Sequence, residues 1–242
     1  MADLLVRYGA TPSPPVLDEQ EKFVDACFRL DRDDVRAHLE KHPEYLQSPA
    51  AIFAAARKDR ADVVAFLLDL GAPIDVQDRQ NQRALHVAAG DKALGAATLL
   101  VDRGAEIDPR DSIYNATPLG YAVHYQHHPM IQLLSRVSRD VWNLAFTGNV
   151  ERLQEVVSAQ PERAKAVSKD GTTPLWWLPD DEATALEIVE LFLAHGADPS
   201  IRSKEGNTAA DWALKRGMIT VAERLIMDRT PEPPPARAPG RG

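Results

Sequence analysis

Cysteine is almost missing from this chain of 242 residues, and its scarcity excludes whole classes of site. With Cys27 alone, there can be no internal disulfide framework and no metal site built on several cysteines. Long apolar runs are missing too. No stretch of about 18 apolar residues occurs, and residues 1–10 lack the basic start and apolar run of a secretory signal. These absences predict a cytoplasmic protein that does not span a membrane.

Concentrated positive charge is also missing. The chain has 28 Lys and Arg against 36 Asp and Glu, a formal net charge of −8, and no block of basic residues. Phosphate backbones and anionic lipid surfaces are bound by clustered Lys and Arg, so we expect neither nucleic acid nor a membrane as the partner. In other respects, 44% hydrophobic and 26% charged residues are ordinary for a folded globular protein.

Signatures of catalysis are missing as well. The sequence holds no phosphate-binding loop, no GxSxG, no HExxH and no dinucleotide fingerprint. The acidic run Asp180–Glu182 has no nucleophile or second carboxylate at a paired spacing. Cys27 corresponds to alanines at a small, packed position of the repeat described below, which favours burial over reactivity. The sequence therefore predicts a non-catalytic protein that needs no cofactor.

His124, His127 and His128 form the one local group that could be considered for a metal. His124 and His128 stand four residues apart, which would put two imidazoles on one side of a continuous helix, as a zinc site needs. Pro129, however, biases His128 away from helix, and no third acidic or cysteine ligand stands at a suitable spacing. We expect no metal here, and place His124 and Tyr125 at exposed positions at the end of a short helix.

What the chain does contain is one pattern that recurs. In residues 83–108, RALHVAAGDKALGAATLLVDRGAEID, a short apolar helix, a turn, a longer apolar helix and a Gly-Ala stop follow one another. Leu85 and residues 87–89 give the first helix an apolar face, and Ala96 with residues 99–100 gives one to the second. Helices this short are unstable alone in water, so each has to pack against a neighbour.

Positions that correspond to Leu85 recur along the whole chain. They are Phe23, Ile52, Leu119, Val141, Leu175 and Ala210. Most lie 29 to 35 residues apart, but the interval before Val141 is 22 because one hairpin is missing. The helix start is repeated at 117–119 and 173–175, and Gly-Ala stops stand at 9–10, 71–72, 104–105 and 196–197. A period near 33 with a T-P-L-H-x-A signature is typical of ankyrin repeats, and the chain resembles that family from its first residues to about Asp228.

The resemblance implies an all-α fold, an ankyrin-repeat solenoid of six to seven stacked helix pairs with short hairpin-like loops. We expect a partial repeat and Pro-rich linker in 1–15, the ankyrin-repeat domain in 16–228, and a disordered Pro-rich tail in 229–242. Within that tail, Pro231 and Pro234 match a PxxP ligand motif. Because 1–10 corresponds only to the end of a repeat, either the chain continues upstream or this face is poorly capped.

Two repeats share a variation, and the last one differs in its surface. A Pro-Glu extension replaces the Gly-Ala stop at Pro43 and again at Pro161, 118 residues later, which indicates a partial internal duplication. The last repeat is expected to have a polar outer face, as a C-terminal cap requires. The residues that predict this are Lys215, Arg216, Glu223, Arg224 and Asp228.

For function, the resemblance implies protein–protein recognition through the concave face of a monomeric adaptor or scaffold. The partner-binding positions carried over from the matching repeats are Arg57, Lys58, Arg79, Gln80, Asp91, Ile113, Tyr114, His124, Tyr125, Lys169 and Trp176. In the pair Trp176-Trp177, Trp177 corresponds to Val87 and is expected in the core, with Trp176 the more exposed ring.

This mixture of basic, aromatic and amide groups predicts an acidic or aromatic-bearing protein segment as the ligand. Two alternatives stay open. The chain could be an inhibitor or immunity-type regulator that blocks one enzyme, or the C-terminal part of a larger protein whose activity lies upstream.

Overall fold

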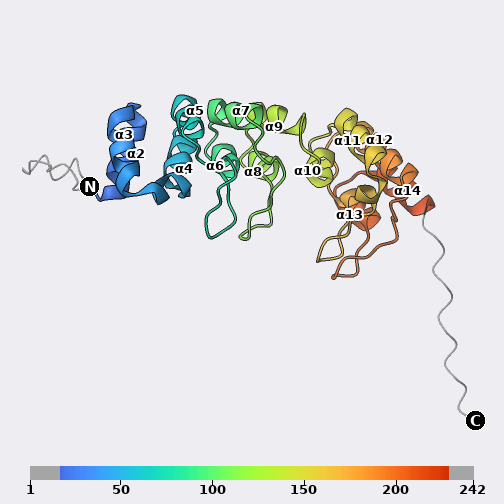
Figure 1. Cartoon of the computed structure of the whole chain (residues 1–242). Helices are drawn as coiled ribbons and strands as arrows, with labels where there is room; N and C mark the ends of the chain where they lie inside the picture. The colour runs from blue at the N-terminus through green and yellow to red at the C-terminus, as the bar shows by residue number, and fades with distance from the viewer. Residues whose placement is uncertain (1–16, 229–242) are drawn as a thin grey trace, which may run out of the picture. The chain divides into compact units, whose positions relative to one another are not determined.

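The computed structural model describes residues 17–228, and the regular secondary structure within them is helical (Figure 1). Thirteen α-helices, numbered from α2 as in Figure 1, and no strand are found in this part of the chain. This confirms the predicted all-α solenoid of stacked helix pairs. The partial repeat and linker expected in 1–15 and the tail expected in 229–242 lie outside the described residues. The chain divides between Asn115 and Ala116 into two compact units, which we call unit 1 and unit 2.

The described part of unit 1 consists of three helix pairs. They are α2 (Glu19–Arg29) with α3 (Arg32–Lys41), α4 (Pro49–Arg57) with α5 (Ala61–Asp69), and α6 (Ala84–Gly90) with α7 (Leu94–Asp102). First helices pack on first helices, as α4 does on α6, and second helices on second helices, as α5 does on α7. A short 3-10 helix, η1 (Pro43–Gln47), follows α3 in place of a Gly-Ala stop.

From Ala116 to Asp228, unit 2 consists of four pairs. They are α8 (Pro118–His124) with α9 (His128–Ser135), α10 (Val141–Phe146) with α11 (Val150–Ala159), η3 (Pro174–Trp176) with α12 (Glu182–Ala194), and α13 (Ala209–Lys215) with α14 (Ile219–Met227). A second 3-10 helix, η2 (Pro161–Lys165), follows α11 as η1 follows α3, so the two Pro-Glu extensions fold alike. Only residues 136–140 separate α9 from α10, which confirms that this repeat has lost its hairpin.

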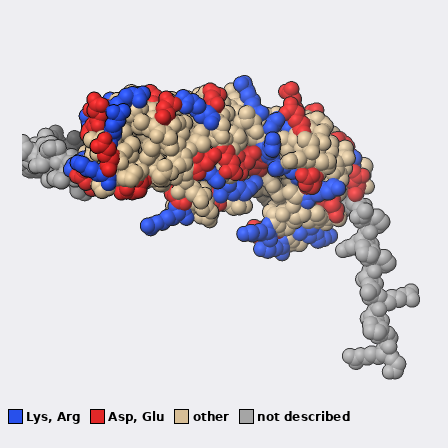
Figure 2. Space-filling model, viewed as in Figure 1, with Lys and Arg blue, Asp and Glu red and all other residues tan. Residues whose placement is uncertain are grey.

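Long loops extend from each unit beyond the layer of first helices (Figure 1). Charges of both signs are spread over the helices on the visible face, whereas Lys and Arg side chains gather at the tips of several of these loops (Figure 2). In the two long loops of unit 2, which precede η3 and α13, the exposed basic residues are Lys169, Arg202 and Lys204.

The positions used to define the repeat lie at the centre of the packing. Leu85 and its six counterparts are each at most 3% exposed, which confirms the register of all seven repeats. In the second helix of the reference repeat, Leu100 is completely buried but Leu99 only partly. The buried face of α7 is therefore narrower than the sequence predicted, because Leu99 lies at its edge.

A single left-handed residue reverses the chain between the two helices of six pairs. These residues are Leu30, Asp59, Lys92, Gln126, Gly148 and Gly217, with φ between 52° and 76°. Glycine adopts this conformation freely, while the other four pay on the order of 1 kcal/mol or more for it. The cost is met by the packing of the two helices that the turn brings together.

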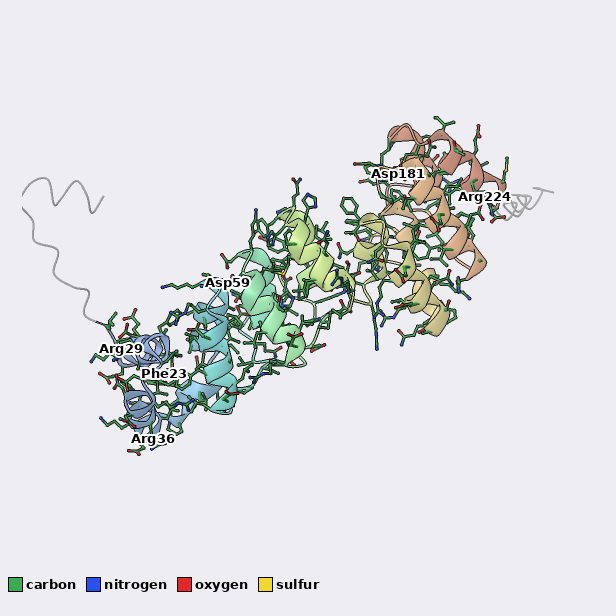
Figure 3. All side chains as sticks on the ribbon, turned by 90° about the horizontal axis from the view of Figure 1, so that it is seen from above. Phe23, Arg29, Arg36, Asp59, Asp181 and Arg224 are labelled. Carbon is green, nitrogen blue, oxygen red and sulfur yellow. The ribbon has the colours of Figure 1, made fainter. Side chains whose placement is uncertain are left out.

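Carboxylates of one pair cap the second helix of the next pair. The residue before α7, Ala93, offers no capping side chain, and Asp59 instead accepts a hydrogen bond from the Ala96 N–H at 2.7 Å (Figure 3). Glu182 of α12 caps α14 in the same way, accepting from the Thr220 N–H at 2.7 Å. A capped N-terminus satisfies otherwise unpaired N–H groups, so these contacts stabilise both the helix and the stacking.

The last repeat is less polar than the sequence predicted. Besides the predicted charged residues, it exposes four large apolar side chains by 45 to 79%. They are Leu214, Ile219, Ile226 and Met227. Leu214 corresponds to Ala89, which is buried because the chain continues into another repeat, whereas no described helix pair follows α14.

We predict that Leu100→Ala lowers the free energy of unfolding by about 2–5 kcal/mol, because it opens a cavity in a fully packed site. Leu99→Ala is the matched control, and its loss should be clearly smaller because Leu99 is already part-exposed. Urea unfolding followed by circular dichroism measures both. Equal losses would mean that the register of α7 is wrong.

A second prediction concerns the cap between pairs. Asp59→Ala removes the carboxylate and, unlike glycine, gains no relief in the left-handed turn, so it should lower the free energy of unfolding by about 1 kcal/mol or more. Asp59→Asn, which retains an acceptor oxygen and tolerates the same conformation, should lose less. If urea unfolding finds the two variants equally unstable, the hydrogen bond to Ala96 contributes nothing.

Candidate functional site

Unit 1 brings four of the predicted contact residues together at two loop tips. The Ser112 N–H donates to the Gln80 carbonyl across 2.8 Å, which ties the loop before α6 to the loop after α7. Buried Asp111 accepts from the N–H groups of the two residues at the tip of its own loop, at 3.1 and 2.7 Å. The residues held there are Arg79, Gln80, Ile113 and Tyr114, with Ile113 and Tyr114 52% and 74% exposed.

Three further predicted residues of unit 1 lie at the ends of first helices. Arg57 and Asp91 form an exposed ion pair with 3.3 Å between Nε and Oδ2. Lys58 lies over the ring of Phe28, 5.2 Å from its centroid. All three side chains are exposed, but Arg57 and Asp91 pair with each other, so a partner that binds one of them must compete with this pairing.

In unit 2, His124 and Tyr125 stand at the end of α8 with their ring centroids 4.9 Å apart, and Tyr125 is 46% exposed. Tyr121 lies beside Tyr125, with the centroids 6.4 Å apart. Lys169 is exposed on the loop before η3. These residues have the predicted exposure, but no described contact joins Lys169 to the histidine and tyrosine.

The tryptophan pair is arranged opposite to the prediction. Trp177 is 45% exposed, whereas Trp176 is part-buried and stacks on Trp212 at a centroid distance of 6.1 Å. The cause is Pro179, which has no N–H for a bond to the Leu175 carbonyl and would clash with it in an α-helix. The first helix of this repeat is therefore reduced to the three-residue η3, and Trp177 follows it at ψ 61°, outside helical geometry.

These rings form part of a larger cluster, which we call the aromatic surface: Phe146, Trp176, Trp177 and Trp212. Phe146 meets Trp177 edge-on at 6.3 Å, and Trp176 stacks on Trp212. Helix α10, η3 with the residue that follows it, and α13 supply these residues from three successive repeats. Phe146, Trp177 and Trp212 are 44%, 45% and 41% exposed.

Sequence reasoning missed three of these four residues. Phe146 corresponds to Gly90 at the end of a first helix, so its exposure could have been found from the repeat alignment. Trp212 corresponds to Val87, a buried position whose slot is too small for an indole, so the ring extends beyond it. The effect of Pro179 on Trp177 could have been found by applying the proline rule inside the repeat.

The acidic run beside Trp177 is structural. Asp180 pairs with Arg216 at 2.6 Å, and Asp181 caps α12 by accepting from the Thr184 hydroxyl and N–H. These hydrogen bonds hold the pKa of Asp181 below its ordinary value. With Glu182 capping α14, all three carboxylates have a role in the fold.

Residues 17–228 show no metal-binding cluster and no membrane-spanning helix. No group of three or more His, Cys, Asp or Glu side chains is placed to hold a metal ion in this range. None of the described helices combines the length and apolarity needed to cross a bilayer.

The sequence matches a family model over much of its length. The model for ankyrin repeats (3 copies) matches residues 24–111 and, in a second overlapping match, 51–143. The chain belongs to the ankyrin-repeat family. Proteins of this family serve generally as protein–protein interaction modules, and the repeats seen beyond residue 143 follow the same helix-pair pattern.

Two proteins of similar length that carry ankyrin-repeat names resemble this chain. Ankyrin repeat protein YahD of Escherichia coli (strain K12) is 26% identical over 191 residues, covering 74% of this chain and 95% of YahD. A solved ankyrin repeat domain from Acinetobacter baumannii AYE shares the fold with a TM-score of 0.52 and 24% identity, over 73% of this chain and 96% of that one.

A longer protein matches over part of its length. Serine/threonine-protein kinase 12 of Arabidopsis thaliana is 28% identical over 123 residues, which is 51% of this chain but 23% of the kinase.

We predict that Cys27 reacts slowly with thiol reagents. It is completely buried, and burial raises the pKa of its thiol to about 12. In the native ankyrin-repeat protein at pH 8, labelling by a disulfide reagent should therefore be much slower than in urea, with Cys27→Ser as the blank. Because the folded state favours the protonated thiol, stability should also fall as pH rises from about 9 toward 12. Rapid native labelling would contradict both expectations.

Proposed function

We propose that this chain is a monomeric, non-catalytic binding module that holds a protein partner against its first helices and loops, with the aromatic surface of unit 2 as the main contact. The observation that carries the proposal is the exposure of Phe146, Trp177 and Trp212 by more than two-fifths each on successive repeats. Most large apolar side chains of the described repeats are covered, as packing requires, so three open rings in one place need a different explanation.

Energetics support the same conclusion. Aromatic side chains bury about 150–250 Å² each and, with arginine, dominate the hot spots of protein interfaces. The Trp176 Nε1–H is buried without a hydrogen-bond partner among the described residues, at a cost of roughly 1–3 kcal/mol. The unsatisfied donor lowers stability, and exposed indoles gain less from burial than covered ones, so the arrangement favours a role in binding.

The loop tips of unit 1 fit a second contact area. The Asp111 hydrogen bonds hold the backbone of Ile113 and Tyr114, so less backbone entropy is lost when these exposed residues bind. Arg79 beside them and Lys169 in unit 2 supply positive charge. We therefore retain an acidic or aromatic-bearing protein segment as the ligand.

Relatives embedded in longer proteins favour one further candidate. Palmitoyltransferase ZDHHC13 of Homo sapiens is 25% identical over 171 residues, which is 27% of that protein, and the plant kinase match is similarly partial. A role as the recognition part of a larger enzyme is consistent with these matches. An inhibitor or immunity-type regulator would use the same surface, but no contact in the structure favours it over an adaptor.

We predict that Trp177→Ala combined with Trp212→Ala weakens partner binding by at least about 30-fold in Kd, corresponding to about 2 kcal/mol for one hot-spot residue. The measurement is quantitative affinity purification with mass spectrometry, followed by titration of the recovered partner. The matched control is Val167→Ala with Ile219→Ala, which removes two exposed apolar side chains of unit 2 outside the aromatic surface.

Tyr114→Ala with Tyr125→Ala serves in the same experiment as a variant of the positions found from sequence. Loss of the partner in this variant but not in the tryptophan variant would mean that the partner binds at the loop tips and α8 and not at the aromatic surface. Equal recovery of every protein by all variants would refute binding through either surface.

A further inference from the structure

Unit 1 has a groove on the side of its second helices, which form the layer opposite the first helices and the loops (Figure 1). The groove lies between α3 and α5 and has a volume of about 310 Å³. We call it the α3–α5 groove, and the residues that line it are Arg32, Val35, Arg36, Leu39, Glu40 and Leu70. Ligand pockets have volumes of about 300–1,000 Å³, so this one has room for a single large apolar group.

The groove exists because α3 has few apolar side chains. Six of its ten residues are Arg, Asp, Glu or Lys. Val35 is its one buried residue, and Leu39 on the same face is part-exposed. Helix α3 packs on α2 and η1, while α5 packs on α4 and α7. The space between the two second helices is therefore left open.

The duplicated repeat in unit 2 shows the same interface in a closed form. Helix α11 corresponds to α3 at the offset of 118 residues, and it packs directly on α12. It buries Leu153, Val156 and Val157. In α3, His38 and Leu39 stand at the last two of these positions, and both are part-exposed. The open groove is thus a property of one copy of the repeat and not of the repeat itself.

Two arginines at the rim of the groove carry charges that no described carboxylate pairs with. Arg32 and Arg36 are exposed and four residues apart, so both extend from one side of α3 (Figure 3). Arg32 lies over the Phe66 ring of α5, 5.1 Å from its centroid. Other arginines of unit 1 do pair with carboxylates, namely Arg29, Arg57, Arg60, Arg83 and Arg103.

The positive charge is also specific to this copy of the repeat. Val150 and Gln154 stand at the corresponding positions of α11, so a second helix of this kind does not require the two charges. Glu40 is the one carboxylate among the residues that line the groove, and it offsets only one of the two arginines. Arginine binds carboxylates through two parallel hydrogen bonds and is enriched at protein interfaces. An apolar group with acidic neighbours therefore complements this groove.

We propose that the α3–α5 groove is a second interaction surface, which binds an acidic segment of a partner protein. One large apolar side chain of the segment packs on Val35, Leu39 and Leu70, and carboxylates of its neighbouring residues bind Arg32 and Arg36. Leu39 and Leu70 are part-exposed, so the groove is open and suits one side chain better than a long acyl chain, much of which would stay in water. This inference goes beyond the proposed function, because the groove shares no residue with the aromatic surface.

The test follows the backbone amide signals of the full chain by nuclear magnetic resonance. The probes are four synthetic peptides with blocked ends, each with one Leu, Ile, Phe or Trp between two Asp residues on either side. At least one peptide should shift the signals of Val35, Leu39 and Leu70 in a saturable way. The same peptide with its apolar residue changed to Ala, or with every Asp changed to Asn, should bind at least about tenfold more weakly, because each lacks one of the two interactions.

Arg32→Gln combined with Arg36→Gln should also weaken binding of the best peptide by at least about tenfold. Both side chains are exposed, so the variant should keep its fold, which circular dichroism and urea unfolding check. Arg136→Gln is the matched control, because Arg136 is likewise exposed, at the end of a second helix of unit 2. Trp177→Ala with Trp212→Ala should bind the peptide as the unaltered protein does, which separates this surface from the proposed function.

Four outcomes would overturn the proposal. The first is equal affinity of the arginine variant and the unaltered protein, or of the Asn and Asp peptides. The second is the absence of any saturable shift in α3 and α5 at millimolar peptide, including shifts confined to unit 2. The third is a change of the same signals with protein concentration before peptide is added, which would assign the groove to a second copy of the chain. The fourth is saturable binding of sodium octanoate but of no peptide, which would make the groove a site for small apolar anions.

Discussion

Burial between neighbouring helix pairs is the condition on which the rest of this structure depends. The helices are too short to be stable alone, and each pair leaves an apolar face that only the next pair can cover. Leu85 and its counterparts fill these interfaces, and polar contacts run beside them. His86, for example, accepts from the Arg83 N–H with Nδ1 and places Nε2 3.1 Å from the Pro109 carbonyl, which links its helix to the following loop. Apolar burial and polar contacts thus both hold neighbouring helix pairs together.

Repeats that lose part of this arrangement replace it by other means. Gly120 stands where His86 does in the reference repeat, so α8 cannot form that link. Buried Asp140 forms another one, accepting from the Thr117 hydroxyl and the Asn143 amide at 2.8 Å each. The repeat without a hairpin therefore still has a polar contact between its helix pair and the next. The loss of one stabilising contact in a repeat is thus offset by another contact in the same repeat or the next.

The sequence predicted the fold well because the fold depends on a period. Seven buried marker positions, the Pro-Glu extensions and the missing hairpin all follow from spacing, and all were confirmed. The predicted contact residues were placed at loop tips and helix ends for the same reason. What spacing could not predict was the effect of one residue on its neighbours. Because of Pro179, Trp177 is exposed and Trp176 is part-buried, the reverse of the prediction. The indole of Trp212 is too large for the buried position that Val87 occupies in the reference repeat.

The short η3 has a consequence for how this protein can change over evolutionary time. In an α-helix, a substitution near the middle alters both a side chain and the helix propensity on which the pair depends. The tryptophans stand instead on a three-residue turn, where the second helix of the pair, α12, and the neighbouring α10 and α13 supply the stability. Selection can therefore replace these rings one at a time to suit a new ligand, while the stack around them is inherited unchanged.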